Sequence, residues 1–394
     1  MGEAGPPRGD DRPGVTLFVH DLAGNAIVRA GPIAQALAAD YRVEIVGLLL
    51  SGDEVYAPYR GRFEVRALRC RPGLAAIAAA ARRLAGMATG DVLYACKPLL
   101  STLLPAVLAG RRGPRPVLLD VEDDEWASRR VDEPAPGVRG WLQRLGDTHA
   151  LDGRIAHLLT GRARAVTVST RALQARYGGV LLRHGPDEAA FDPTRPELSD
   201  RAALRRDLGL PIDRKVAVFA GRPRPHKGWG TLLEALALPA AAGWDLALAG
   251  EVDGSAAREA AALLGGRFHA LGLRDNAAMP ALLAAADAAP APQRDEPFTR
   301  AQLPAKVLEA MAMRVPVVAS AVGDLPEVLG GGERGWLVPA GDAGALAAAL
   351  AAIAADPAGA ARRTEAARRW FVSEASEAAI RARVVPLVAE ALGR

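Results

Sequence analysis

Two charged residues stand in an otherwise apolar stretch of this 394-residue chain. Lys306 and Glu309 lie three positions apart in LPAKVLEAMAMRVPVVAS, a spacing that places both on one face of a helix. Pro304 suits the first turn of that helix, where its missing N–H is not needed. A carboxylate among apolar neighbours is costly unless it has a partner. The pattern therefore predicts a binding function for the two charges, with a simple surface pair as the alternative.

A second set of cations follows a predicted buried strand, KVAVFAG. The loop RPRPHKG comes next, and a helix through Leu232 and Leu236 follows it. The start of a helix presents unpaired N–H groups and the positive end of its dipole, so this strand, loop and helix predict an anion site. Arg222 and Lys227 would add two full positive charges there, although ordinary surface cations would give the same pattern.

Lysine is rare in this chain. Of its 49 Lys and Arg residues, only Lys97, Lys215, Lys227 and Lys306 are lysine. Arginine thus serves wherever any positive charge suffices, and we expect the lysines where a compact, mobile ammonium is needed. Three of the four stand at the starts or ends of predicted elements.

The composition limits the class of protein. Half of the residues are hydrophobic and 24% are charged, which is typical of a globular chain too long for one ordinary core. A net charge of +4 does not indicate nucleic-acid binding, but it allows an anionic substrate or peripheral contact with an acidic membrane. Cys70 and Cys96 form no disulfide framework or zinc motif. With neither a signal peptide nor a membrane-spanning run, a cytoplasmic protein is expected.

Strands and helices alternate along both halves of the chain. Strands are predicted at residues 15–20, 41–50, 63–68, 91–96, 117–121, 165–169 and 180–183, and again at 216–220, 245–249, 268–270, 287–292, 315–320 and 335–338. This alternation predicts an α/β fold of two doubly wound, Rossmann-like domains with parallel sheets. Such sheets bind ligands at the carboxyl ends of their strands, so we expect the two domains to face each other across a cleft.

Domain boundaries follow from composition. The proline- and acid-rich segment HGPDEAAFDPTRP separates the two halves. We expect a disordered tail over residues 1–14, an N-terminal domain over 15–188, a C-terminal domain over 189–372, and a helix over 373–394 that packs back on the N-terminal domain.

The motifs GRPRPHKG, LPAKVLEAMAMRVPVVASAVGDLPEVL and GWLVPAGD resemble the C-terminal half of retaining glycosyltransferases of family 4 (group 1), which have the GT-B fold. HGPDEAAFDP resembles that family's interdomain segment. The resemblance implies a nucleotide-sugar donor, a UDP- or GDP-sugar, held by the C-terminal domain. It also implies an acceptor glycan, lipid or small molecule held by the N-terminal domain, with neither a cofactor nor a metal.

The resemblance also implies roles for particular residues. Arg222 and Lys227 would grip the donor diphosphate as the catalytic pair, and Glu309 would bind the ribose. Further donor-side residues are Lys306, Glu296, Thr299, Arg300, Gln302 and Gly323. Acceptor-side candidates come instead mostly from positions that follow predicted strand ends, and they are Gly24, His20, Lys97, Glu122, Asp123 and Asp124.

This chain departs from the family pattern in its acidic residues. The family usually carries two glutamates eight residues apart around this helix, but Ala301 stands eight before Glu309, and Glu296 stands thirteen before it. Many members also carry a histidine late in the strand that matches residues 91–96, where this chain has none. Lys97 or the acidic run 122–124 could take its place.

The resulting hypothesis is retaining, metal-independent transfer of a sugar to an acceptor hydroxyl, in glycan, glycolipid or secondary-metabolite biosynthesis. One alternative is a nucleotide-sugar epimerase of the same fold, which would convert its substrate without an acceptor. The departures from the family pattern suggest a second alternative, which is a non-catalytic scaffold or binding protein.

Overall fold

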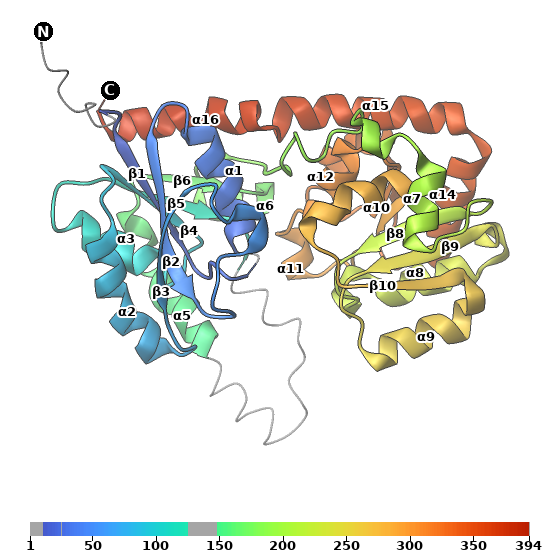
Figure 1. Ribbon diagram of the computed structural model, residues 1–394, viewed down its shortest axis with the longest axis horizontal. Helices are drawn as coiled ribbons and strands as arrows, with labels where there is room; N and C mark the ends of the chain where they lie inside the picture. Colours follow the sequence, from blue (N-terminus) through green and yellow to red (C-terminus); the bar gives the residue numbers. More distant parts are fainter. Residues whose placement is uncertain (1–10, 25, 125–147, 394) are drawn as a thin grey trace, which may run out of the picture. The chain divides into compact units, whose positions relative to one another are not determined.

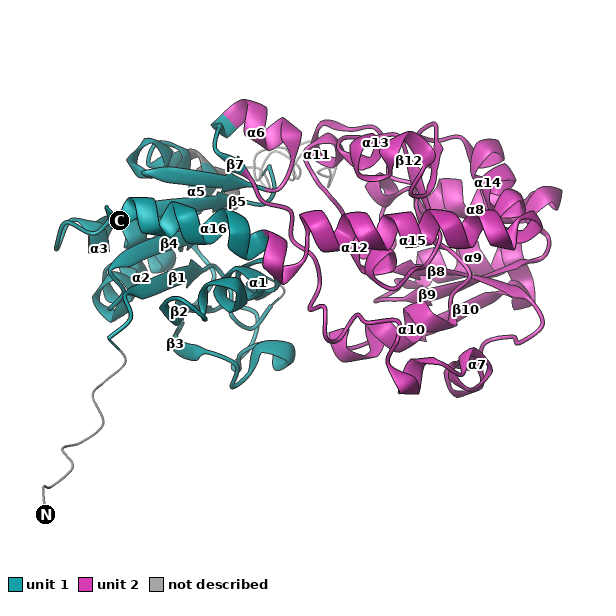
Figure 2. Ribbon diagram, turned by 90° about the horizontal axis from the view of Figure 1, so that it is seen from above, with its two compact units in different colours: residues 1–168, 177–180, 380–394 teal, residues 169–176, 181–379 magenta. Residues whose placement is uncertain are grey.

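The computed structural model describes residues 11–24, 26–124 and 148–393 (Figure 1). The chain forms two compact units (Figure 2). Unit 1 comprises residues 1–168, 177–180 and 380–394, and unit 2 comprises residues 169–176 and 181–379. The chain therefore passes between the units four times, after residues 168, 176, 180 and 379. Most of the tail predicted over residues 1–14 lies outside the described residues.

Unit 1 is built on a seven-stranded sheet in the order β3-β2-β1-β4-β5-β6-β7. Its strands are β1 (Gly14–Val19), β2 (Arg42–Leu49), β3 (Glu64–Arg69), β4 (Val92–Cys96), β5 (Val117–Val121), β6 (Ala165–Val168) and β7 (Val180–Leu181). All pairs from β3 to β6 are parallel. Its helices are α1 (Ile27–Leu37), α2 (Leu74–Met87), α3 (Leu103–Gly110), α5 (Thr148–His157) and most of α16 (Glu377–Ala391). The strands β1, β4 and β5 are buried along their whole length, as expected of parallel strands with both faces covered.

The carboxyl-terminal helix α16 lies beside the end of α1 (Figure 1). The guanidinium of Arg381 pairs with Asp40 at 2.5 Å, and the Tyr41 hydroxyl donates to the carbonyl oxygen of Val385 at 3.4 Å. The end of the chain is thus part of the unit that its beginning forms.

The single helix predicted from Ser373 is interrupted in the structure. The preceding helix, α15 (Pro357–Glu374), runs past Ser373, and two residues separate its end from the start of α16. The Ser376 hydroxyl oxygen accepts the N–H of Ala379 at 3.0 Å. This side chain satisfies a free N–H at the start of α16, which makes a new helix start favourable there.

Unit 2 also has a parallel sheet, in two groups ordered β10-β9-β8 and β11-β12-β13. A parallel bridge between Ala217 and Ala288 joins them. The strands are β8 (Lys215–Ala220), β9 (Trp244–Ala249), β10 (Phe268–Gly272), β11 (Ala289–Ala291), β12 (Val317–Ser320) and β13 (Trp336–Val338). The helices are α6 (Arg171–Tyr177, all but its last residue), α7 (Arg201–Leu208), α8 (Trp229–Ala237), α9 (Gly254–Leu264), α10 (Met279–Ala285), α11 (Pro297–Arg300), α12 (Ala305–Ala312), α13 (Leu325–Val328), α14 (Ala343–Ala355) and α15.

Two apolar clusters form the core of unit 2. One includes Leu308, Met311 and Phe371, from α12 and α15, and the other includes Trp229 and Leu350, from α8 and α14. Because the strands are parallel, their carboxyl ends and the loops that follow them share one edge of the sheet.

Among the described residues, no single helix is long and apolar enough to cross a membrane. One pair of helical stretches, α14 and residues 357–391, is long and apolar enough when taken together, but the pair is bent by 105°.

Candidate functional site

The loop after β8 brings cations to the carboxyl edge of the unit 2 sheet. The ammonium of Lys227 lies 3.4 Å from where a Cβ of Gly221 would stand. Gly228 begins α8 with φ of +72°, and a Cβ there would lie 1.6 Å from the carbonyl oxygen of Pro292. Only glycine fits this position. The cationic loop after β8 is therefore held tightly against the loop after β11.

Lys306 joins this group of cations from α12. Its Nζ lies 3.7 Å from the centre of the Phe219 ring, is shielded from solvent and has no hydrogen-bond partner among the residues described. Burial, and then the nearby Lys227, lower the pKa of Lys306 to about 7, against the opposing effect of Glu309. An ammonium buried without an acceptor is costly, and a bound anion would supply one.

The pKa of Lys227 is also lowered by its surroundings. Burial lowers its pKa, and the positive charges of Arg224 and Arg222 lower it further. Arg222 itself forms an exposed ion pair with Glu251, the second residue after β9. Arg224 and Glu251 were not among the predicted site residues, although Arg224 lies within the RPRPHKG motif.

Glu309 is half-buried and follows Lys306 on the same helix, as predicted. Burial raises the pKa of Glu309 to about 7, while the Lys306 charge opposes that rise. Within the described part of the chain, no group donates a hydrogen bond to its carboxylate. Its oxygens are therefore available to accept hydrogen bonds from the hydroxyl groups of a ligand.

The loop after β11 is shaped by its own residues. The Glu296 carboxylate accepts the N–H of Thr299, and the Thr299 hydroxyl accepts the N–H of Glu296 at 3.0 Å. The N–H groups of Arg300 and Gln302 donate within the same turn at 3.0 and 3.3 Å, and Arg300 pairs with Asp295 at 2.6 Å. In this structure, the predicted donor-side residues Glu296, Thr299 and Arg300 stabilise the loop itself.

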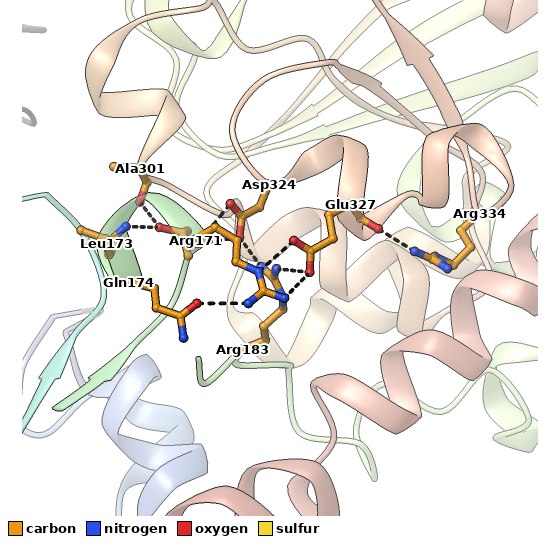
Figure 3. A network of polar contacts seen from close by, with 9 residues as sticks. Arg171, Leu173, Gln174, Arg183, Ala301, Asp324, Glu327 and Arg334 are labelled. Carbon is orange, nitrogen blue, oxygen red and sulfur yellow. Dashed lines mark hydrogen bonds and ion pairs between the residues drawn. The ribbon is translucent and has the colours of Figure 1, made fainter. Parts of the chain in front are cut away.

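Gly323 lets the loop after β12 pack closely against the loop after β11. It has φ of +56°, and a Cβ there would lie 2.7 Å from the carbonyl oxygen of Arg300. The next residue, Asp324, accepts the N–H of Arg171 at 3.0 Å and pairs with Arg183 at 2.7 Å (Figure 3). Both side chains of the Asp324–Arg183 pair are nearly inaccessible, at 4% and 2% exposed. This buried pair holds the backbone beside Gly323.

Glu327 extends this network on α13. Its carboxylate accepts from Arg171 at 3.1 Å and from Arg183 at 3.2 Å, while Arg334 donates to its backbone (Figure 3). The Thr170 hydroxyl also donates to the carbonyl oxygen of Ala301 at 3.2 Å. Residues 169–176, which separate β6 from β7 in the sequence, are thereby fixed to the loops after β11 and β12. This network was not predicted from the sequence.

The carboxyl edge of the unit 1 sheet collects most of the predicted acceptor-side residues. His20, Lys97 and Glu122 directly follow β1, β4 and β5, which are neighbours in the sheet. The Lys97 ammonium lies 3.4 Å from Glu122 and 3.2 Å from Asp123. Lys97 has φ of +82°, a conformation that costs energy for a residue other than glycine and is often found at functional sites. Burial raises the pKa of Glu122 to about 7, although Lys97 lowers it.

The remaining acceptor-side candidates surround the same edge. The imidazole Nδ1 of His20 hydrogen-bonds the Ser101 hydroxyl at 2.7 Å. A Cβ on Gly24 would lie 3.0 Å from the Asp21 carboxylate and 3.3 Å from the Ser51 hydroxyl, so this glycine is closely packed. Asp124 is the last described residue before the gap that begins at residue 125.

No group of three or more His, Cys, Asp or Glu side chains in the described part of the chain is arranged to hold a metal ion. In the acidic run, the carboxylates of Glu122 and Asp123 both pair with the ammonium of Lys97. This ammonium supplies the positive charge that the two carboxylates share.

Comparisons with known proteins bear on this site. Residues 214–356 match the family described as Glycosyl transferases group 1. D-inositol 3-phosphate glycosyltransferase of Mycobacterium tuberculosis is 33% identical over 187 residues. That alignment covers 43% of this chain and 37% of the relative, so the match spans little more than a third of the relative's length.

Several solved structures resemble almost the whole chain. Anabaena HepE in complex with UDP and glucose has a TM-score of 0.72 and 20% identity, covering 96% of this chain and 99% of that one. Sucrose-phosphate synthase from Thermosynechococcus elongatus has a TM-score of 0.73 and 22% identity, covering 97% and 100%. This likeness confirms the predicted α/β, GT-B fold.

Proposed function

We propose that this protein is a retaining, metal-independent glycosyltransferase that moves a sugar from a nucleotide-sugar to an acceptor hydroxyl. The buried Lys306 ammonium, which lacks a hydrogen-bond acceptor and stands beside the Lys227 charge, is the observation that carries the proposal. A diphosphate is the anion whose size and charge suit several cations at the ends of parallel strands. The group 1 match covers all of these residues, and the UDP in the HepE structure supports a uridine nucleotide.

The proposed chemistry assigns roles to Arg222, Lys227 and Glu309. The bond between the sugar C1 and the phosphate oxygen breaks, and Arg222 and Lys227 stabilise the negative charge that develops on the departing diphosphate. Glu309 accepts hydrogen bonds from the ribose. The acceptor oxygen bonds to C1 on the face that the phosphate leaves, and its proton passes to the departing phosphate oxygen.

A thermal-shift panel tests the donor site. UDP-, GDP-, ADP- and dTDP-sugars are added to the wild type, to Glu309→Ala, and to Glu259→Ala, an exposed control on α9. A ligand at about 100 times its Kd adds roughly 2.7 kcal/mol of stability. We expect a selective shift that Glu309→Ala abolishes and Glu259→Ala retains. No shift from any nucleotide with folded protein would contradict the donor site.

Product analysis separates the two rival functions. An epimerase would change the sugar of the bound donor with no acceptor present. A scaffold would bind nucleotides weakly or not at all and give no turnover. A transferase releases free nucleoside diphosphate in proportion to the acceptor glycosylated, and mass spectrometry of the reaction mixture distinguishes the three outcomes.

A further inference from the structure

A hollow of about 550 Å³ opens at the carboxyl ends of β2 and β3 in unit 1. Residues 49–53 and 69–72 line it. Leu49 and Cys70 contribute apolar surface, and Asp53, Arg69 and Arg71 contribute charge. Its volume falls in the range of small-molecule sites, about 300–1,000 Å³. None of the site residues described above lines this hollow.

The charges of the hollow do not balance. Arg69 pairs with Asp53 at 3.1 Å, which neutralises one of the two guanidinium groups. Arg71 has no side-chain hydrogen bond or ion pair in the described part of the chain. A guanidinium presents a planar set of donors that matches the two oxygens of a carboxylate or phosphate. Arg71 is exposed, so the hollow presents to solvent one guanidinium that has no side-chain partner among the described residues, a group of the type that binds oxyanions.

The hollow also adjoins the edge that holds the acceptor-side candidates. The Asp21 carboxylate, in the loop after β1, accepts the N–H of Leu50 at 3.0 Å, and it hydrogen-bonds the Ser51 side chain. Gly24 packs against Ser51 from the same loop. In the order β3-β2-β1-β4, the hollow lies about two to three strand spacings from Lys97, or roughly 12 Å. A ligand of disaccharide size could extend from one to the other.

We propose that this hollow is a distal subsite for the acceptor, which takes a phosphate or carboxylate group carried on a sugar or polyol, with Arg71 as the main recognition residue. The assignment rests on the proposed function, because only a transferase has an acceptor. The reacting hydroxyl then lies toward Lys97 and Glu122, and the charged end lies between the ends of β2 and β3.

Cys70 provides a direct probe of occupancy. It lines the hollow and is half-buried, whereas the other cysteine, Cys96, is buried and 2% exposed. Burial raises the pKa of the Cys70 thiol, so alkylation by N-ethylmaleimide is followed in mildly alkaline buffer. The probes are glucose 6-phosphate, glucose and inorganic phosphate, added to the wild type and to Arg71→Gln. Arg82→Gln is the matched control, an exposed arginine on α2 outside the hollow.

We expect glucose 6-phosphate at about ten times its Kd to slow alkylation of Cys70 about tenfold, because alkylation then needs the free hollow. Glucose should give no protection, Arg71→Gln should abolish protection, and Arg82→Gln should retain it. Equal protection by glucose and glucose 6-phosphate would overturn the proposal, as would no protection by any probe. Protection that persists in Arg71→Gln would mean an adventitious anion only, and would overturn it too.

The donor panel separates this proposal from the proposed function. A nucleotide-dependent thermal shift without protection of Cys70 overturns the distal subsite alone. Protection of Cys70 without any nucleotide shift overturns the transferase, and with it the acceptor assignment. Both effects together, with Arg71→Gln retaining the nucleotide shift, support an anionic acceptor.

Discussion

Lys306 in unit 2 and Lys97 in unit 1 stand at equivalent edges of two parallel sheets, but their surroundings are opposite. Lys306 is buried over an aromatic ring without a hydrogen-bond acceptor, and Lys97 lies beside the carboxylates of Glu122 and Asp123. Lys306 can therefore take a bound anion as its partner, whereas the charge of Lys97 is already neutralised by two carboxylates. The residues that follow neighbouring strands therefore decide whether such an edge suits a phosphate or a hydroxyl group.

The largest effect expected from this comparison is on turnover. Replacing Lys227 with methionine should lower the transfer rate about 10²–10³-fold, because it removes a positive charge from the site proposed for the departing diphosphate. Lys215→Met is the matched control, since Lys215 begins the same strand at the opposite edge of the sheet. Steady-state rates of nucleoside diphosphate release measure both variants. Equal losses of rate in Lys227→Met and Lys215→Met would show that Lys227 does not act on the departing group.

The two lysines should respond differently to removal of their charge. Lys97→Met leaves Glu122 and Asp123 facing each other, and we expect the free energy of unfolding to fall by about 1.5–3 kcal/mol. Lys306→Met removes a buried charge without an acceptor, so the free energy of unfolding should stay unchanged or rise, while UDP binding weakens. Urea unfolding of both variants is the measurement. Losses of similar size would remove the distinction between the two edges.

The pH dependence of anion binding provides a further test of the difference between Lys306 and Lys97. The pKa of Lys306 is lowered from 10.5 to about 7 in the folded protein, so above pH 7 the unfolded chain keeps a proton that the folded protein has lost. The Lys306 contribution to the free energy of unfolding therefore rises with pH between about 7 and 10.5. UDP affinity should change in the opposite direction and fall by up to about tenfold per pH unit, because the ammonium is lost.

Titration calorimetry with UDP between about pH 7 and pH 9, where its terminal phosphate is mostly in the doubly ionised form, measures this dependence. In Lys306→Met, the affinity should be lower at pH 7 and should lose the fall with rising pH that the ammonium causes, which leaves only the dependence that Glu309 contributes. A wild-type affinity that stays constant across this range would show that Lys306 does not contact the nucleotide.

The smallest effect concerns the exposed pair of Arg222 and Glu251. Glu251→Gln should change the free energy of unfolding by only about 0–1 kcal/mol, since both side chains are more than half exposed. It should modestly raise UDP affinity, because Arg222 is released for the ligand, and this gain should shrink at high ionic strength. Calorimetry at low and high salt provides the measurement. A loss of affinity would assign Glu251 itself to the nucleotide.

Much of the fold is predictable from the sequence because its buried strands are continuous apolar runs. The strand predicted at residues 117–121 matches β5 at both ends, and those predicted at 216–220 and 245–249 each differ from β8 and β9 by one residue. The helix that carries Lys306 and Glu309 was also predictable, because helical spacing depends only on neighbouring residues. Local patterns were therefore sufficient to position the charges at the strand ends.

Interactions between distant residues were not predictable. Asp324 and Arg183 are 141 positions apart, and no spacing rule connects them. The hollow between the ends of β2 and β3 depends on the shape of two loops, which a single sequence does not reveal. The break between α15 and α16 depends on the Ser376 hydroxyl. Such features depend on the packing of the whole unit.

The four passages of the chain between its units have a consequence for protein engineering. Neither unit is a continuous piece of the sequence. Residues 177–180 of unit 1 interrupt unit 2, and residues 380–394 return to unit 1 with the buried side chains of Ile380, Val384 and Val388. A hybrid that joins the first half of this chain to the second half of a relative would place a foreign helix in the unit 1 core. Exchange of donor specificity between relatives should therefore keep the terminal helix with the first half.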